Sequence, residues 1–341
     1  MILLPPLKKR YAFFVGFLLL LLSVLWFTWF VRSAPGTGSS KVIFNFKGAL
    51  TFRSIARELS EKEIITSPLF FTLYGRFRGE DSKVKAGFYQ FDDGMTPQEI
   101  LRKLVAGEVY LRPFVLPEGY STYQAAELLG QQGLLDGKRF LALCRDQELL
   151  KKLGVHEDSL EGYLVPGTYN VEPEMDEAGL ITVMVGQFNG IRRPRYDARV
   201  KASGNSWHDL LTIASMIDKE AVVPTERPVI ASVFRNRLAQ RMRLQSDPTS
   251  VYGVRAFAGK VTKRDILSAS PYNTYLIPGL PPGPIGNPGD QALDAALNPA
   301  TTPYLYFVAK KDGTHHFSRS LAEHTKAVAT YLKKLSIEWT P

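Results

Sequence analysis

Residues 207–240 read WHDLLTIASMIDKEAVVPTERPVIASVFRNRLAQ, and this pattern predicts two helices in succession. Apolar side chains recur every three or four positions on both sides of Pro224, as they do in helices that pack one face on a core. We expect the first helix to cover residues 207–223, and the second to begin at a Thr225 cap and to run to about Gln240. Together with segments elsewhere that alternate like strands, the helix pair indicates an α+β fold.

The helix pair belongs to a larger predicted domain, residues 113–341, that mixes helices with short strands. A loop rich in proline and glycine at residues 270–289 interrupts it, and so long a loop in a compact domain is usually functional or disordered. The other expected elements are helices at 121–129, 138–150 and 321–335, a strand at 304–309, a turn at 311–314, a partner strand at 315–318, and an aromatic, turn-rich stretch at 160–171.

Residues 41–112 predict a smaller α/β unit. Short strands are expected at 42–46 and 87–91, and amphipathic helices at 51–60 and 96–106. A spacer domain and a module that binds glycan or protein fit this pattern equally well.

Residues 11–31 form an apolar segment without a charge. As a helix it would span about 31 Å, close to the thickness of a bilayer's hydrocarbon core. A cleaved signal peptide is the alternative, but its apolar region would be shorter and would end at small residues. Basic residues 8–10 precede the segment and only Arg32 follows closely, so the positive-inside rule predicts a cytoplasmic tail at 1–10 and an external domain beyond a linker at 32–40.

The composition narrows the classes of function. The chain of 341 residues has a net charge of +9 and one cysteine, Cys144, which excludes an intramolecular disulfide. Its five histidines form neither an HExxH motif nor a cluster with cysteine, so we expect no metal and no cofactor. The charge suits anionic lipid or an anionic wall polymer. Nucleic acid is not an expected partner, because the external compartment of a bacterium holds very little of it.

Glu220 is the candidate general acid. On a helix about 200° separates it from Asp218, so the two carboxylates do not form one pair. Apolar neighbours one turn back and the negative end of the helix dipole both favour its neutral form, which a general acid needs. The alternative is a solvated glutamate or an ion pair with Arg227 or Arg235.

Two further patterns near this helix are weaker. Ser215 and Lys219 are one turn apart and could form a nucleophile, although a surface pair is the more ordinary interpretation. A basic run follows and consists of Arg235, Arg237, Arg241 and Arg243. It is either a solvated helix face or a site that binds an anionic substrate.

Two stretches carry the residue types of a saccharide cleft. Short polar side chains suit sugar hydroxyls and amides, and tyrosine rings stack on sugars. The candidates are Gln245, Ser246 and Asp247 in MRLQSDPTSVYG, and Tyr272, Asn273 and Tyr275 in SPYNTYLIPGLPPGPIGNPG. Three histidines are interpreted as surface residues of a hairpin and a helix rather than as ligands, namely His315, His316 and His324.

These stretches, followed by TPYLYFVAKKDGTHHFS, resemble the endolytic murein transglycosylases of the MltG (YceG-like) family. The resemblance runs from about residue 42 to 335, and the apolar segment matches the family's architecture. It implies a lyase, anchored in the bacterial inner membrane by a single pass, that cuts nascent peptidoglycan within the strand. It also implies penicillin-binding proteins as neighbours.

The resemblance assigns roles to particular residues. The family's catalytic glutamate is the last acid of an E-K-E triplet, which here reads Asp218-Lys219-Glu220, so the role falls on Glu220. Residues 41–112 resemble the family's LysM-like module. Where relatives often have Pro-Asp, this chain has Pro166-Gly167 and so lacks a carboxylate at that place. Three nearby residues remain candidates for the cleft, namely Glu161, Tyr163 and Tyr169.

The resulting expectation is a lytic transglycosylase that cleaves the MurNAc-GlcNAc bond and leaves 1,6-anhydroMurNAc ends. Only one well-placed acid is expected, so the substrate's own 6-hydroxyl would be the nucleophile. The alternative is a catalytically silent scaffold that binds the wall and recruits synthesis enzymes.

Overall fold

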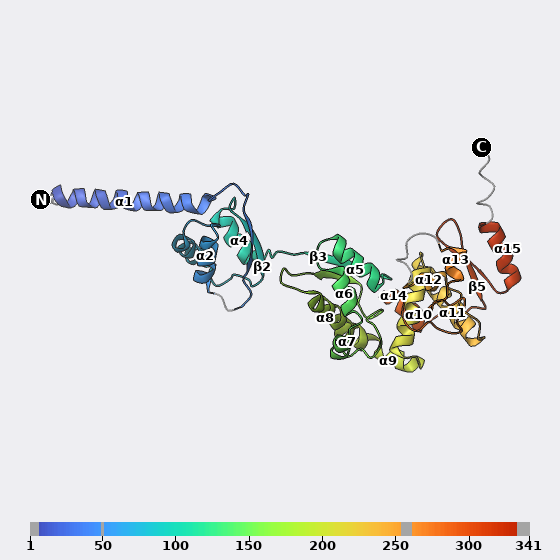
Figure 1. Cartoon of the computed structure of the whole chain (residues 1–341). Coiled ribbons are helices and arrows are strands. Elements are labelled where there is room, and N and C mark those ends of the chain that lie inside the picture. Colours follow the sequence, from blue (N-terminus) through green and yellow to red (C-terminus); the bar gives the residue numbers. More distant parts are fainter. Residues whose placement is uncertain (1–6, 49–50, 254–260, 333–341) are drawn as a thin grey trace. The chain divides into compact units, whose positions relative to one another are not determined.

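The structure is a computed structural model that describes residues 7–48, 51–253 and 261–332 (Figure 1). Contacts divide the chain into two compact units, Met1–Arg112 and Pro113–Pro341, and each unit has a hydrophobic core of its own. Helices occur with antiparallel strand pairs in both units, so the predicted α+β class is confirmed.

The first unit begins with a long apolar helix, α1 (Leu7–Arg32). Among the described residues it is the one helix long and apolar enough to cross a membrane, judged by length and composition alone. Most of its side chains are exposed, but Phe30 and Val31 in its last turn are buried in the core of this unit.

The remainder of the first unit is a two-stranded sheet with three helices. Strand β1 (Lys41–Asn45) pairs antiparallel with β2 (Phe88–Asp92). The helices are α2 (Phe52–Glu61), α3 (Pro68–Phe77) and α4 (Pro97–Ala106). The strands and helices predicted here are confirmed to within a residue or two. Helix α3 was not predicted, because its sequence PLFFTLYGRF is apolar on almost every side and lacks the polar face that marks an amphipathic helix.

The second unit opens with a strand pair and a series of helices. Strand β3 (Pro113–Leu116) pairs antiparallel with β4 (Gly167–Asn170). The helices that follow in this part are α5 (Thr122–Gln131), α6 (Gly137–Leu143), α7 (Gln147–Lys152), α8 (Glu177–Gln187), a π-helical turn (Phe188–Arg192) and α9 (Arg193–Ser203).

The helix predicted at residues 138–150 is wrong as a single element. Helix α6 ends at Leu143, and the Asp146 carboxylate accepts a hydrogen bond from Leu149 N to begin α7. An aspartate that caps a helix N-terminus competes with continuation of the preceding helix.

The predicted helix pair is present, with different ends. The first helix is α10 (Trp207–Glu220), which stops before Val223 because the residue preceding Pro224 is extended. Thr225 is not a cap, since it lies inside a 3₁₀ turn (Pro224–Glu226) that leads into α11 (Arg227–Ala239).

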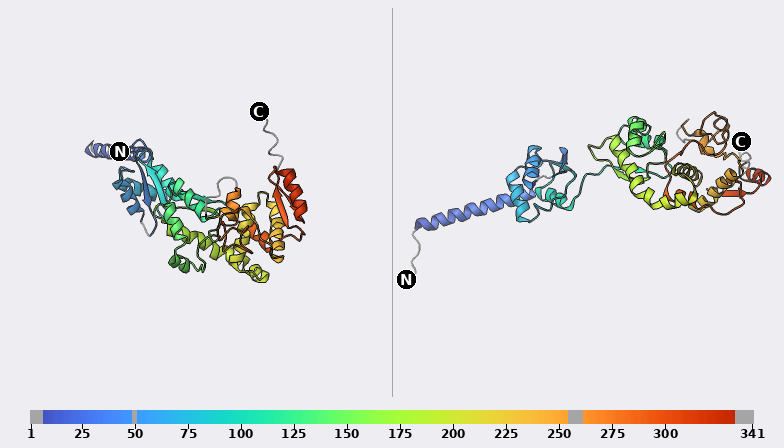
Figure 2. Two further views of the ribbon diagram at one scale, coloured as in Figure 1. Left: turned by 45° about the vertical axis from the view of Figure 1, so that its right-hand side comes forward. Right: turned by 90° about the horizontal axis from the view of Figure 1, so that it is seen from below.

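The C-terminal part carries short helices and a hairpin. These are α12 (Asp247–Val251), α13 (Lys263–Ile266), α14 (Asp290–Leu297), the antiparallel strands β5 (Tyr306–Ala309) and β6 (His315–Ser318), and α15 (Leu321–Tyr331). Helix α15 packs on both strands (Figure 2). The hairpin and the closing helix were predicted, and residues 333–335 of that prediction lie outside the described residues.

The loop at residues 270–289 is built into the core rather than lying free. Asn287 is fully buried, and its side-chain oxygen accepts hydrogen bonds from Gly162 N and Leu164 N. Its amide donates to Tyr120 O and to Glu161 Oε1. The loop therefore joins distant parts of the second unit and holds them in register.

Candidate active site

Glu220 is the last residue of α10, and its side chain lines a cleft of about 510 Å³. The turn before α12, the 270–289 loop, helix α11, the β5–β6 hairpin and α15 all contribute to its walls. The lining residues are Glu220, Arg237, Leu244, Gln245, Asp247, Tyr275, Tyr306, Phe307, Val308, Ala309, His315, Leu321, His324, Val328 and Leu332.

The Glu220 carboxyl is partly buried and accepts a hydrogen bond from Ser246 Oγ at 2.5 Å. Burial raises the pKa of Glu220 to about 7, and the neighbouring charge of Asp247 adds to the rise. The Ser246 hydrogen bond and the positive charge of Arg237 oppose it. Near neutral pH this carboxyl can therefore donate a proton and then take one back, which is what general acid–base catalysis requires.

Ser246 is held by a buried network of hydroxyls. Its backbone N–H donates to Thr274 Oγ1, which is 2.8 Å from Thr249 Oγ1. The preceding residue, Gln245, has a φ of +47°, in the left-handed region that is uncommon for a residue with a side chain. This tight turn directs the Ser246 hydroxyl toward Glu220.

Asp247 is the second carboxylate of the cleft. Its Oδ1 accepts a hydrogen bond from Tyr275 Oη at 2.6 Å, which ties the start of α12 to the 270–289 loop. Burial raises the pKa of Tyr275, and the hydrogen bond to Asp247 raises it further, so the phenol remains a donor. Asp247 thus already accepts a hydrogen bond within the chain.

Three of the four arginines in the basic run donate hydrogen bonds to backbone carbonyl groups of the chain itself. Arg237 is 7% exposed and donates to Leu305 O and Leu244 O, with its guanidinium over the Tyr306 ring. Arg235 donates to Ala300 O, and Arg243 donates to Tyr275 O. Arg237 supplies the positive charge beside Glu220 and also fixes the cleft wall.

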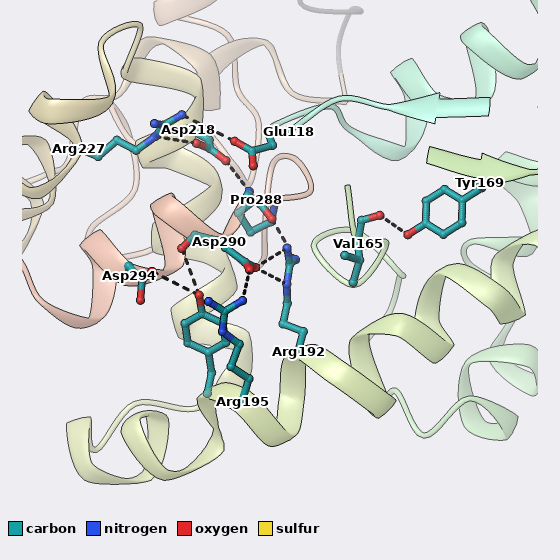
Figure 3. A network of polar contacts seen from close by, with 12 residues as sticks. Glu118, Val165, Tyr169, Arg192, Arg195, Asp218, Arg227, Pro288, Asp290 and Asp294 are labelled. Atoms are coloured by element: carbon teal, nitrogen blue, oxygen red, sulfur yellow. Dashed lines mark hydrogen bonds and ion pairs between the residues drawn. The ribbon is translucent and has the colours of Figure 1, made fainter. Parts of the chain in front are cut away.

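Asp218 is not among the residues that line the Glu220 cleft, and it lies beside Arg227 and Glu118 (Figure 3). Its side chain is 2% exposed, bonds Arg227 Nε at 3.1 Å and accepts from Gly289 N at 2.7 Å. We call Asp218, Arg227 and Gly289 the α10 clamp. Arg227 therefore pairs with Asp218, and the alternative of an ion pair between Arg227 and Glu220 is wrong.

The Ser215–Lys219 pair does not form. Ser215 Oγ donates to Thr212 O and accepts from Ile285 N, so it belongs to the core. Lys219 Nζ donates to Gln124 Oε1.

The three candidates of the 160–171 stretch lie in the core and outside the lining of the Glu220 cleft, as Ser246 does. Glu161 is 1% exposed and accepts hydrogen bonds from Thr122 and from Tyr252 Oη. Burial raises the pKa of Glu161 to about 7. Tyr163 packs against Phe188, and Tyr169 donates its hydroxyl hydrogen to Val165 O (Figure 3).

The structure also separates the three candidates of the 270–289 loop. Tyr275 reaches the cleft, whereas Tyr272 packs its ring on Tyr252 at a centroid distance of 4.6 Å. Asn273 is fully buried, donates to Ile266 O and Ser268 O, and accepts from Tyr275 N. Asn273 therefore shapes the loop that presents Tyr275.

Comparison with known proteins identifies the family. The model of the YceG-like family matches residues 46–330. The chain belongs to the YceG-like family. It is 34% identical over 307 residues to an endolytic murein transglycosylase of Bacillus subtilis, with 85% of each chain covered.

Other YceG-like relatives extend this result. The chain is 29% identical over 312 residues to an endolytic murein transglycosylase of Streptococcus pneumoniae, and the match covers 82% of this chain and 56% of that protein. A crystal structure of a YceG-like protein from Listeria monocytogenes is 34% identical, with a TM-score of 0.59. The match covers 84% of this chain and 99% of the Listeria monocytogenes chain.

The β5–β6 hairpin and α15 of this YceG-like chain supply a wall of the cleft that the sequence did not predict. His315 and His324 line the cleft, although both were interpreted as surface residues. His315 Nδ1 lies 2.7 Å from Glu226 Oε2, and the His324 ring stacks on Tyr306. The concentration of aromatic and histidine residues in this hairpin was the sequence feature that could have predicted its place in the cleft.

Across the described ranges, no group of three or more His, Cys, Asp or Glu residues is arranged to hold a metal ion.

Proposed function

We propose that this chain is a membrane-anchored lytic transglycosylase that cuts the MurNAc-GlcNAc bond inside peptidoglycan strands, with Glu220 as acid and then base. The observation that carries this proposal is the partly buried Glu220 carboxyl, with its pKa of about 7, in an open cleft of a YceG-like chain. The name of the Bacillus subtilis relative supports the same activity.

The first step breaks the glycosidic bond. Protonated Glu220 gives its proton to the glycosidic oxygen, the C1–O bond breaks, and the GlcNAc strand leaves as an alcohol. C1 of the muramic sugar becomes oxocarbenium-like, and its own N-acetyl group can shield that centre, as in substrate-assisted glycosidases.

The second step closes the product. The Glu220 carboxylate takes the proton of the same sugar's 6-hydroxyl, and O6 forms a bond to C1. The result is a 1,6-anhydroMurNAc end and a Glu220 that is protonated again. An intramolecular hydroxyl has a large effective molarity, which favours it over water.

Asp247 is proposed to position groups rather than to activate water, since Tyr275 already donates to its Oδ1. With Gln245 it offers polar groups for sugar hydroxyls and amides at the cleft, whereas Ser246 is 1% exposed and already donates its hydroxyl hydrogen to Glu220. If Asp247 activated water instead, the enzyme would be a hydrolase that uses two carboxylates.

The proposed setting is the outer face of the bacterial inner membrane. Helix α1 would span that membrane with the N-terminus in the cytoplasm, following the basic residues at 8–10. Residues 41–112, which resemble the family's LysM-like module, would act either as a spacer or by binding glycan or protein, and penicillin-binding proteins would be neighbours. These two roles rest on the family resemblance.

Mass spectrometry of digested sacculi tests the chemistry. The full chain in detergent should release muropeptides about 18 Da lighter than hydrolysed ones, the mass of a water never added. Reducing ends that carry label from ¹⁸O-water would establish hydrolysis instead. A wall-binding scaffold, the rival function, would release nothing while still sedimenting with sacculi.

A further inference from the structure

Helix α3 presents an apolar stripe to solvent. Leu69, Leu73 and Phe77 are exposed by 63%, 45% and 85%, respectively. They are spaced by four residues, so on a helix they lie within about 80° of one another and form one continuous strip. We call these three residues the α3 stripe. None of the three residues belongs to the described core of the first unit.

The neighbouring faces of α3 are occupied. Phe71 and Tyr74 are buried in the core of the first unit, and Phe71 stacks on Phe52. On another side, Phe70 is enclosed by the end of α1. Its ring centroid lies 5.1, 5.9 and 5.5 Å from those of Trp26, Phe27 and Phe30. Helix α3 is therefore fixed against both the core and α1, with the α3 stripe left open.

The contact with α1 sets the depth of α3. If residues 11–31 fill the hydrocarbon core, Trp26 lies five residues, or about 7.5 Å, inside the outer boundary. Amphipathic helices at membrane surfaces bury their apolar face by about 5–10 Å at the boundary of headgroups and acyl chains. A helix whose Phe70 touches Trp26 must therefore lie at that boundary.

We propose that the α3 stripe docks into the outer leaflet of the membrane that α1 spans, so that the first unit rests on the lipid surface. This inference rests on the proposed function of α1 as an anchor. The occupant is lipid, because α1 covers only the Phe70 side of α3 and lipid surrounds α1 at this depth.

The charges of α3 agree with this placement. The helix has no acidic residue, and Arg76 in its last turn keeps a 60% exposed side chain with its Nε 4.0 Å from Asp81 Oδ2. A long arginine side chain can lie along apolar surface and carry its charge out to phosphate headgroups. The contact would hold the module at residues 41–112 close to the bilayer.

Nitroxide accessibility tests the docking in the full chain. Single cysteines would replace Leu69, Leu73 and Phe77 in turn, in protein reconstituted into nanodiscs of phosphatidylethanolamine and phosphatidylglycerol. All three positions are exposed, so the substitutions leave the core intact, and Cys144 is buried and escapes labelling. Ile43→Cys is the matched control, an exposed apolar position on β1. Leu20→Cys reports on the anchor.

Membrane docking predicts that labels at 69, 73 and 77 are more accessible to oxygen and less accessible to a soluble nickel chelate than the label at 43. Equal accessibility at 43 and the α3 stripe, with the label at 20 in lipid, would overturn the inference but leave the anchor intact. Labels at the α3 stripe shielded from both reagents would indicate a protein partner and would also overturn it. A label at 20 reached by nickel would instead refute the anchor.

Discussion

Ser246 Oγ donates a hydrogen bond to Glu220 Oε1 and so joins the end of α10 to the turn that begins α12. The donor favours the ionised form of Glu220, while burial and Asp247 favour the neutral form. The balance brings the pKa of the carboxyl to about 7 rather than to its ordinary value of 4.5. One hydroxyl thus tunes the group that must act first as an acid and then as a base.

Glu220→Gln should abolish most of the activity and leave the fold unchanged. The amide keeps the shape and can still accept from Ser246, but it cannot donate a proton to the glycosidic oxygen. We expect release of muropeptides to fall by about 10²- to 10⁴-fold. Turnover of purified sacculi, followed with circular dichroism of the same sample, measures both quantities.

Asp218→Asn is the matched control on the same helix. It weakens the α10 clamp and should cost about 1–3 kcal/mol of stability, while activity below the unfolding temperature falls far less than in Glu220→Gln. Equal losses of activity in two folded variants would remove Glu220 from its assigned role.

The pH profile should shift in Ser246→Ala. In the wild type, kcat/KM should decline as the pH rises through about 7, because the first step needs protonated Glu220. Without the Ser246 donor the carboxylate is less stable, so its pKa rises and the decline moves to higher pH. Ser250→Ala is the control, since Ser250 Oγ donates only to Asp247 O. An unchanged profile in Ser246→Ala would contradict the assignment.

Stability should depend on pH through the same carboxyl. Its pKa is about 7 in the folded state and about 4.5 when exposed, so its contribution is fully present below about pH 4.5 and is lost as the pH rises through 7. The loss amounts to about 3 kcal/mol. Glu220→Gln removes this dependence, so the variant should unfold at a higher denaturant concentration than the wild type at pH 8 but not at pH 4.

Topology gives an independent check. Basic residues 8–10 outnumber the single Arg32 on the other flank of the apolar segment, so the C-terminus should lie outside the cytoplasm. A reporter active only in the cytoplasm, fused after Pro341, should remain silent. The same reporter placed before residue 8 should be active, and activity at both ends would refute the orientation.

A fragment of residues 41–341 should cut glycan in solution, because every residue that lines the cleft belongs to the second unit. The fragment lacks Phe30 and Val31, which are buried in the first unit, so that unit should unfold at a lower temperature. Digestion of sacculi and scanning calorimetry would separate the two effects. A folded second unit without activity would mean that the membrane supplies part of the site.

The local pattern of apolar and capping residues predicted much of the fold, because helix periodicity and helix caps depend on residues only a few positions apart. It located Glu220 on its helix, and it predicted both strands of each terminal pair to within two residues. It failed at the 138–150 segment, where the Asp146 cap divides the helix.

The composition of the cleft was harder to predict, because it depends on tertiary packing. Asn273 and Glu161 are the residue types that bind sugars, yet their hydrogen bonds go to the chain itself. His324 is 87 residues from Arg237 in the sequence, and the packing of α15 on the hairpin brings both to one cleft. Spacing along the sequence does not predict which distant residues tertiary packing brings into one cleft.

The α10 clamp has a consequence for genetics. Loss of Asp218 or Arg227 would remove the ion pair that fixes the end of α10. A Cβ atom at Gly289 would meet only the end of the Glu118 side chain, which is half exposed and can move aside, and the Gly289 N–H would still reach Asp218. In a selection for loss of function at high growth temperature, substitutions at Asp218 and Arg227 should therefore be recovered alongside substitutions at Glu220, although neither residue lines the cleft. Growth temperature would separate the two classes of allele, because a loosened helix can be rescued by cooling and a missing proton donor cannot.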